Sequence, residues 1–200
     1  NDEKLAELQK EYKTMDCIKA ELSDIKQVTN IPKADIVVHS AALSTVWGRR
    51  REFVKNNITA TENIIKYCVQ KKVKKLVYIS TPSVYSEKRD RFDVKEDEYS
   101  KNNKLNYYIE TKIAAEKIVS DAKSPDLEVV IIRPKGLIGA GDTSILPRII
   151  QANKKMGIPV FEGREDILVD MTSVENAAYS ILLCIEKKGI FGEVFNITNG

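Results

Sequence analysis

Cysteine and histidine are scarce in this sequence. Its 200 residues include three Cys and one His. Cys17, Cys68 and Cys184 have no partner at metal-ligand or redox spacing, and their odd number is typical of a reducing compartment. His39 lies inside an apolar run, so a Ser–His or Cys–His nucleophile is not expected. The sequence therefore predicts a cytoplasmic protein without a metal site.

Long hydrophobic runs and a strong charge of one sign are also missing. No apolar run reaches the roughly 18 residues that a membrane-spanning helix needs, and no signal peptide is visible. The net charge of +3 does not favour a nucleic-acid partner. The basic run KKVKK (71–75) is expected to be a solvated turn rather than a phosphate-binding patch. A small-molecule substrate is the expected partner.

Apolar runs alternate with helical patterns, which is typical of an α/β domain with a parallel sheet. Strands are predicted within MDCIKAEL (15–22), ADIVVHSAAL (34–43), KLVYIS (75–80) and LEVVIIRP (127–134), with a last strand in GEVFNITNG (192–200). Helices are predicted over about 57–70, 106–122, 144–155 and 172–188, and residues 86–104 are expected to form a polar excursion. We expect a core over 1–136, and a substrate-binding region over 137–200 whose final strand returns to the core.

Two helices have a predicted inward face. In the helix over 57–70, the inward positions are expected to be Ile58, Ile65 and either Cys68 or Val69.

The helix over 172–188 is expected to begin with a capping box of Thr172 and Glu175. Its inner stripe is predicted to consist of Val174, Ala178, Ile181 and Ile185.

Tyr and Lys occur four residues apart at two places, in YCVQK (Tyr67 and Lys71) and in YIETK (Tyr108 and Lys112). About one such pair is expected by chance from this composition, so the spacing alone decides nothing. Lys71 opens the basic turn and is expected to face water. A change at Tyr67 should therefore affect only packing.

Tyr108 and Lys112 have different surroundings, because they share a helical stripe with Ala115, Val119 and Ala122. This stripe is the predicted buried face. A buried lysine is costly unless something needs its charge.

Hydroxyl residues follow the strand VYIS directly, in STPS (80–83). In open parallel sheets, ligands bind at the carboxyl ends of strands. Ser80, Thr81 and Ser83 either complete the turn of the chain or face a ligand there.

Such a hydroxyl fits the chemistry of a Tyr–Lys pair. A tyrosine pKa near ~10 is too high for proton transfer at neutral pH, and a nearby ammonium favours the phenolate. Tyr108 could then exchange a proton with a substrate oxygen that a hydroxyl side chain holds, while a nicotinamide supplied the hydride chemistry.

With these residues in place, the chain resembles an extended short-chain dehydrogenase/reductase, the superfamily of nucleotide-sugar epimerases and 3β-hydroxysteroid dehydrogenases. The segments that carry the resemblance occur in the family's order: IKAELSD (18–24), DIVVHSAAL (35–43), FVKNNITATENII (53–65), VYISTPSVY (77–85), YIETK (108–112), IIRPKGLIGAGD (131–142), VDMTSVENAA (169–178) and EVFNITNG (193–200). The resemblance implies a Rossmann-type, doubly wound parallel sheet that is truncated at its N-terminus, with a small C-terminal substrate-binding lobe.

The resemblance also implies roles for single residues. It assigns the catalytic roles to Thr81, Tyr108 and Lys112, with Lys112 also holding the cofactor ribose. NAD or NADP is the implied cofactor, and the implied cofactor neighbours are Glu21, Leu22, Ala41, Ala42, Asn57, Ser80, Tyr108, Lys112, Pro134, Gly136 and Leu137. Asn57 is expected either to hold the geometry between strand and helix or to organise a relay water.

Within the superfamily, the chain looks most like the 3β-hydroxysteroid and sterol dehydrogenase branch. That branch interconverts a secondary alcohol and a ketone on an apolar substrate. Pro82 and Ser83 stand where the dehydratases carry an Asp–Glu pair, so dehydration is not expected. A nucleotide-sugar 4-epimerase, for which Arg148 and Arg164 could hold a diphosphate, and a non-catalytic relative remain alternatives.

One family feature is missing, since no Gly-rich phosphate loop follows a first strand. The GAGD segment (139–142) comes too late to replace it. Either the 200 residues are an excerpt of a longer protein, or the protein has lost tight dinucleotide binding, and the intact Thr81, Tyr108 and Lys112 favour the excerpt. The helices over 57–70 and 106–122 could form the homodimer of relatives. Trp47 and residues 49–51 either contact substrate or begin a solvated helix.

Overall fold

The computed structural model describes residues 2–45, 47–89, 91–143, 145–158, 163 and 169–199. The helices are α1 Asp2–Glu11, α2 Ile25–Thr29, α3 Arg50–Phe53, α4 Ala60–Lys71, α5 Tyr107–Asp121, α6 Leu146–Met156 and α7 Val174–Glu186, with a π-helical turn η1 at Val54–Thr59 and a 3-10 turn η2 at Pro82–Tyr85. The strands are β1 Ile36–His39, β2 Lys75–Ile79, β3 Glu128–Pro134, β4 Gly136–Ile138, β5 Met171–Ser173 and β6 Val194–Ile197.

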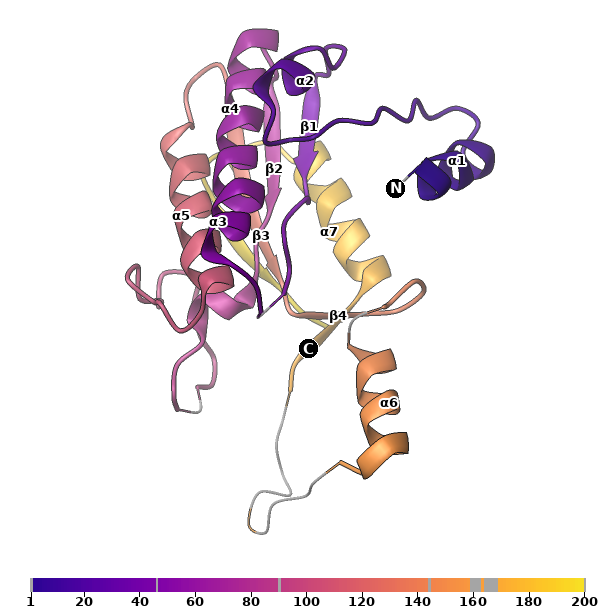
Figure 1. Cartoon of the computed structure of the whole chain (residues 1–200). Coiled ribbons are helices and arrows are strands. Elements are labelled where there is room, and N and C mark those ends of the chain that lie inside the picture. The colour runs from indigo at the N-terminus through magenta and orange to yellow at the C-terminus, as the bar shows by residue number, and fades with distance from the viewer. Residues whose placement is uncertain are drawn as a thin grey trace.

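Four of these strands form a parallel sheet in the order β1-β2-β3-β6. Helices α4 and α5 lie on one side of the sheet, and α7 lies on the other (Figure 1). This is the predicted Rossmann-type α/β class, and the prediction is confirmed. All carboxyl ends of the parallel strands point to the same edge, which is where a ligand site is expected.

Each central strand is buried on both faces, and its side chains alternate between them. On β2, Leu76 and Tyr78 join the core under α4 and α5, whereas Val77 and Ile79 pack in the core under α7. The strand β3 repeats the pattern with Ile131 on the first side. The near-continuous apolar runs in the sequence reflect this double coverage.

The predicted strand in residues 15–22 was wrong. These residues form no strand, because no described strand pairs with them to complete a ladder of backbone hydrogen bonds. The neighbouring strand β1 is shorter than predicted. Val38 on β1 is 38% exposed, so in the described residues this strand is covered on one face only.

Helix α7 begins one residue later than the predicted capping box. Its N-cap is Ser173, whose hydroxyl accepts from the Asn176 backbone N–H. Thr172 instead belongs to β5, accepts from the Lys135 backbone N–H and donates to the Ile197 carbonyl. The predicted cap was wrong because Thr172 is needed to join β4 and β5 to the main sheet.

The inner faces of two helices agree with the prediction in part. In α7, Ile181 and Ile185 pack against the core as predicted and Val174 is half-buried, whereas the predicted Ala178 is exposed. The buried residues of this helix are Ala177, Ser180 and Cys184.

In α4, Cys68 points inward as expected while Val69 is 65% exposed. Ile64 and Tyr67 are also buried, and the predicted Ile65 is half-buried against the same core. The predicted Ile58 is half-buried and lies in η1. Sequence periodicity placed each inner face to within about one residue.

The basic run at 71–75 is not a solvated turn throughout. Lys75 is 7% exposed, and its Nζ donates to the carbonyls of Cys184, Ile185 and Lys187, at 3.0, 3.2 and 2.8 Å. It also pairs with Glu128 at 3.2 Å. The expectation failed for Lys75 because its ammonium satisfies the free carbonyls at the end of α7, 109 or more residues away in sequence.

Beyond residue 136 the chain leaves the main sheet and returns to it. Strands β4 and β5 pair in parallel, and α6 extends away from the main sheet (Figure 1). No described residue of α6 is buried. The chain re-enters the sheet through α7 and β6. The predicted division at residue 136 stays a prediction.

Candidate active site

The carboxyl edge of the sheet brings the predicted segments together. Ala41 and Ala42 follow β1, and Ser80 follows β2, which pairs with β1 through His39 and Tyr78. Pro134 ends β3, the next strand along the sheet. Residues from three separate parts of the chain therefore line one edge.

Lys112 is buried on α5, with 1% of its surface exposed. Its Nζ donates to the Tyr78 hydroxyl oxygen at 2.7 Å and to the Ile79 carbonyl at 2.8 Å. The ammonium also lies 4.2 Å from the centre of the Tyr78 ring. Burial lowers the pKa of Lys112 to about 8, and the charge of Glu116 opposes this shift. Lys112 is therefore a buried charge held at the end of β2.

Tyr108 lies one helical turn before Lys112 and is half-buried. It packs against a cluster of Val84, Tyr85, Ile109 and Ile113. Burial raises the pKa of Tyr78, and the nearby Glu116 and Tyr108 add to this shift, so both phenols lie in one neighbourhood. The cluster holds the Tyr108 ring by packing between η2 and α5.

Thr81 and Ser80 differ in how their hydroxyls are satisfied. Thr81 is the N-cap of η2, and its Oγ1 accepts from the Ser83 backbone N–H at 3.2 Å and donates to the Ser83 hydroxyl at 3.1 Å. Ser80 is 8% exposed, and its Oγ is the one buried side-chain polar atom without a hydrogen-bond partner in the described part of the chain. A buried unpaired hydroxyl costs free energy, so Ser80 fits a group that binds there.

Asn57 lies in the π-helical turn η1 and clamps two segments. Its Oδ1 accepts from the Leu43 backbone N–H at 2.7 Å, and its Nδ2 donates to the Leu43 carbonyl at 3.3 Å and to the Thr111 hydroxyl at 3.1 Å. The side chain thus ties the loop after β1 to α5. These contacts are those of the structural role, and a role toward a cofactor stays a prediction.

The remaining predicted cofactor neighbours are spread more widely. Ala41, Ala42 and Leu137 are exposed, and Gly136 is half-buried.

Glu21 and Leu22 lie beside η1 and α4, where Lys55 pairs with Glu21 at 3.5 Å and Asn63 donates to the Leu22 carbonyl at 2.9 Å. Glu21 and Leu22 do not belong to a strand, and their position in the fold is given by these contacts with η1 and α4.

The GAGD turn between β4 and α6 has a structural explanation. Gly139 has φ of +144°, and a Cβ there would lie 2.5 Å from Val174 Cγ2. The carboxylate of Asp142 accepts from the backbone N–H groups of Ile145 and Leu146, at 3.1 and 2.9 Å. The chain's own carboxylate therefore occupies the start of α6, where a phosphate would otherwise be attracted.

A second buried charge lies on α5 next to this site. Glu116 and Arg133 form a two-pronged ion pair, with N–O distances of 2.9 and 2.6 Å, and both side chains are almost fully buried. Arg133 also donates to the Glu96 carbonyl at 2.7 Å and to the Tyr85 hydroxyl. The pair ties the excursion over 86–104 to the core.

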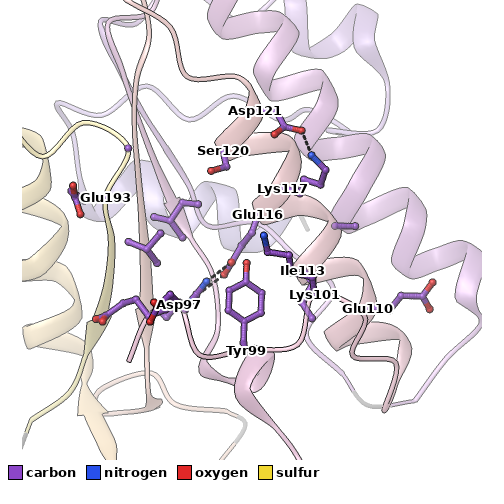
Figure 2. A pocket seen from close by; sticks show the side chains of 16 residues that line it. Asp97, Tyr99, Lys101, Glu110, Ile113, Glu116, Lys117, Ser120, Asp121 and Glu193 are labelled. Atoms are coloured by element: carbon purple, nitrogen blue, oxygen red, sulfur yellow. Dashed lines mark hydrogen bonds and ion pairs between the residues drawn. The ribbon is translucent and has the colours of Figure 1, made fainter. Parts of the chain in front are cut away.

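A cavity of about 780 Å³ lies over this ion pair, between α5, the excursion and β6 (Figure 2). Glu116, Tyr99 and Ile113 are among its lining residues. Neither Tyr108 nor Lys112 lines it. Because neither the buried ammonium nor the residues that follow β1 and β2 line it, the cavity is not the candidate catalytic site.

The other Tyr–Lys pair has a structural role. Tyr67 is buried and donates to the Pro32 carbonyl at 2.6 Å.

The basic segment after β1 is exposed. Trp47 is 83% exposed, and Arg50 pairs with Glu110 of α5 at 2.6 Å.

Sequence reasoning missed three residues near Lys112, namely Tyr78, His39 and Thr61. Tyr78 contacts the ammonium directly, and His39 Nε2 lies 3.0 Å from the Thr61 hydroxyl. His39 and Tyr78 are paired positions of β1 and β2, with ring centres 5.5 Å apart. The strand period of two could have placed Tyr78 on the α5 side. No sequence signal linked it to Lys112.

None of the helices in the described ranges is long and apolar enough to cross a bilayer. The same residues contain no group of three His, Cys, Asp or Glu side chains that could hold a metal ion.

Two curated relatives are similar to this chain in sequence. The 2-alkyl-3-oxoalkanoate reductase of Shewanella oneidensis is 36% identical over 156 residues, which cover 74% of this chain and 40% of the relative. The decarboxylating sterol-4-alpha-carboxylate 3-dehydrogenase of Schizosaccharomyces pombe is 34% identical over 184 residues, which cover 88% and 53%. The chain spans about half the length of the curated relatives it matches.

A solved structure is similar in fold and sequence. The UDP-glucuronic acid 4-epimerase from Bacillus cereus, in complex with UDP-glucuronic acid and NAD, has a TM-score of 0.71 and 28% identity. The match covers 93% of this chain and 59% of the epimerase. The sequence model of one family matches residues 1–197, almost the whole chain, and agrees with the parallel sheet and the resemblance drawn from the motifs. The chain therefore belongs to the 3-beta hydroxysteroid dehydrogenase/isomerase family.

Proposed function

We propose that this chain is the part of an NAD- or NADP-dependent oxidoreductase that carries Tyr108 and Lys112. The proposed enzyme interconverts a secondary alcohol and a ketone on an apolar substrate. One observation carries the proposal, namely the buried ammonium of Lys112 at the carboxyl end of β2, one turn from Tyr108. Burying an ammonium costs free energy, and perturbed charges of this kind cluster at functional sites.

The residues at the strand ends fit a dinucleotide. Ser80 offers a buried hydroxyl without a partner, and Lys112 uses two of its three N–H donors in its hydrogen bonds to Tyr78 and Ile79. Ala41 and Ala42 leave open surface at the end of β1. When bound, a nicotinamide supplies or takes up the hydride. We assign Ser80, Lys112 and the small residues after β1 to hold it.

Two side chains then act on the substrate oxygen, and a third acts on Tyr108. In the reducing direction, Tyr108 donates its phenolic proton to the oxygen of the ketone. Thr81 holds that oxygen by a hydrogen bond. The positive charge of Lys112 stabilises the phenolate that remains on Tyr108. In the oxidising direction the phenolate takes the proton back.

The substrate proposed is an apolar 3-oxo or 3-hydroxy acid. Both curated relatives are named for compounds with an oxygen on carbon 3 and a carboxylate on the adjacent carbon. Leu146, Ile149 and Ile150 of α6 expose an apolar surface after β4, which supports an apolar body for the substrate.

A nucleotide-sugar 4-epimerase is the second candidate, because the Bacillus cereus epimerase shares 28% identity with the chain. Arg148 of α6 is exposed and could meet a diphosphate, and Arg164 lies outside the described residues.

Substitution of Tyr108 tests the proposal. In the complete gene product, Tyr108→Phe should reduce turnover by at least about a thousandfold, because the proton donor is lost while the ring remains. Cofactor affinity should stay within a few-fold. Tyr107→Phe is the matched control, since Tyr107 is the preceding residue of α5 and is 45% exposed. An unchanged rate in Tyr108→Phe would refute the assignment.

Cofactor titration and a substrate panel separate the candidates. NADH and NADPH fluorescence titrations should show micromolar binding to the complete gene product. The panel then compares a 2-alkyl-3-oxoalkanoate, a sterol 4-carboxylate and UDP-glucuronic acid. Turnover of the last alone would favour the epimerase, and no cofactor binding would favour a non-catalytic relative.

A further inference from the structure

The hydrogen bond between Lys112 and Tyr78 has a determined direction. An ammonium can only donate, so the Tyr78 oxygen accepts from Lys112 Nζ at 2.7 Å. The hydrogen of the Tyr78 hydroxyl must therefore point away from the ammonium. Near this pair, on the same side of the sheet, the Thr61 hydroxyl donates to the Asn57 carbonyl at 2.7 Å.

The Thr61 hydroxyl determines the tautomer of His39. Its Nε2 lies 3.0 Å from Thr61 Oγ1, whose single hydrogen is directed to the Asn57 carbonyl. His39 Nε2 is therefore the donor, and Nε2 carries the hydrogen. Burial, together with the charge of Lys112, lowers the pKa of His39 to about 4, so the ring is neutral at pH 7. A second positive charge is thus kept away from the ammonium.

We propose that Tyr78 is a positioning residue for Lys112, and that its oxygen holds the buried ammonium in place and keeps it protonated. The proposal rests on the proposed function, in which Lys112 acts as a cation. It assigns a role to a tyrosine that is distinct from the proton donor Tyr108.

The groups that face Lys112 leave Tyr78 as a main support of its charge. From the strands, His39 is neutral, and the Ile79 carbonyl is the other direct acceptor at 2.8 Å. From α5, Tyr108 precedes Lys112 by one turn. Glu116 is the nearby carboxylate, but both of its oxygens are bound to Arg133. The direct contacts of the ammonium are therefore made by two neutral oxygens, one of which belongs to Tyr78.

The substitution Tyr78→Phe removes one of these oxygens and little else. The ring remains 4.2 Å below the ammonium and keeps its packing in the core. Because the hydrogen bond to the charged form is lost, the Lys112 pKa should fall from about 8 by about one unit or more.

Lysine NMR on the complete gene product measures this directly. Lysines are labelled with ¹³C at Cε, and the Lys112 signal is identified by its loss in Lys112→Met. The titration midpoint of that signal should be at least about one pH unit lower in Tyr78→Phe than in the wild type. Tyr67→Phe is the matched control, since it also removes a buried tyrosine hydroxyl, one bound to the Pro32 carbonyl at 2.6 Å. The control should leave the midpoint unchanged, and equal midpoints in Tyr78→Phe and the wild type would overturn the proposal.

A second variant guards against a misfolded Tyr78→Phe. Tyr78→Met also removes the hydroxyl oxygen and fills the buried volume with a flexible apolar side chain, so it should shift the Lys112 midpoint in the same direction. Far-UV circular dichroism shows which variants fold. An unshifted midpoint in a folded variant would overturn the proposal.

The NMR midpoint does not depend on turnover, so the two proposals can fail separately. An inactive protein with the expected shift would support the positioning role and refute the enzyme. An active enzyme without the shift would do the reverse. In an active enzyme, the alkaline limb of the kcat profile should move to lower pH in Tyr78→Phe by the same interval as the midpoint, with KM changed less than kcat.

Discussion

Replacement of Glu116 by Gln should destabilise the protein more than any surface substitution on the same helix. Glu116 and Arg133 are about 2% and 1% exposed, and two N–O contacts of 2.9 and 2.6 Å join them. Glu116→Gln keeps the size of the side chain and one acceptor oxygen, but it leaves the Arg133 charge buried without a counter-charge. Removing one partner of a buried pair costs about 3–5 kcal/mol.

We expect the lower end of that range, about 3 kcal/mol, because Gln can still accept one hydrogen bond from Arg133. Arg133 also keeps its bonds to Tyr85 and to the Glu96 carbonyl, so it stays in the core with its charge. A loss of this size is a large share of the roughly 5–15 kcal/mol that stabilise a typical domain.

Urea unfolding of the complete gene product, followed by far-UV circular dichroism, measures the loss. The matched control is Asp121→Asn, which breaks the Lys117–Asp121 pair on the same helix, at the rim of the cavity (Figure 2). Both partners of that pair are more than 60% exposed, so solvent screening should limit its effect to about 0.5 kcal/mol. Equal losses in the two variants would refute the reasoning, because burial would then not decide the cost.

Two further predictions concern other buried cations and bases. His39 has a folded-state pKa of about 4, below its unfolded value of about 6.5, so protons bind the unfolded state first as the pH falls. Between pH 7 and pH 4 the free energy of unfolding of the wild type should fall by about 3 kcal/mol more than that of His39→Asn. Urea unfolding at each pH measures the difference. Equal losses in the two proteins would contradict the burial of a neutral ring. Lys75→Met should cost about 2 kcal/mol because the carbonyls at the end of α7 lose their donor, whereas Lys74→Met, at an exposed ion pair, should change the melting temperature little.

The sequence by itself determined the order of elements and the neighbourhood of the candidate site. The double-sided strands over 75–80 and 127–134 were readable from their apolar runs, because two covered faces leave no polar alternation. The stripe through Lys112, Ala115 and Val119 was also readable, and these three residues are buried. In both cases the signal lies within one segment, where periodicity is a local property of the chain.

The boundaries and caps of helices and strands were harder to predict from the sequence, because each depends on a contact with a distant segment. Residues 15–22 have strand-like composition, but a strand needs a neighbour for its backbone hydrogen bonds. Thr172 has the right spacing for a capping box with Glu175, but its hydroxyl is bound to Ile197 of the last strand. A competing contact from a distant segment decided each case.

Only the tertiary structure decided how the buried charges are satisfied. Lys75 donates to the carbonyls at the end of a helix more than a hundred residues away, and Arg133 forms an ion pair with Glu116. Lys112 donates to the hydroxyl of Tyr78, which lies 34 residues before it. A lysine in the sequence has the same formula whether it is solvated or buried. The free energy of its charge depends on the acceptors that other segments bring within hydrogen-bond distance, and the fold alone creates that arrangement.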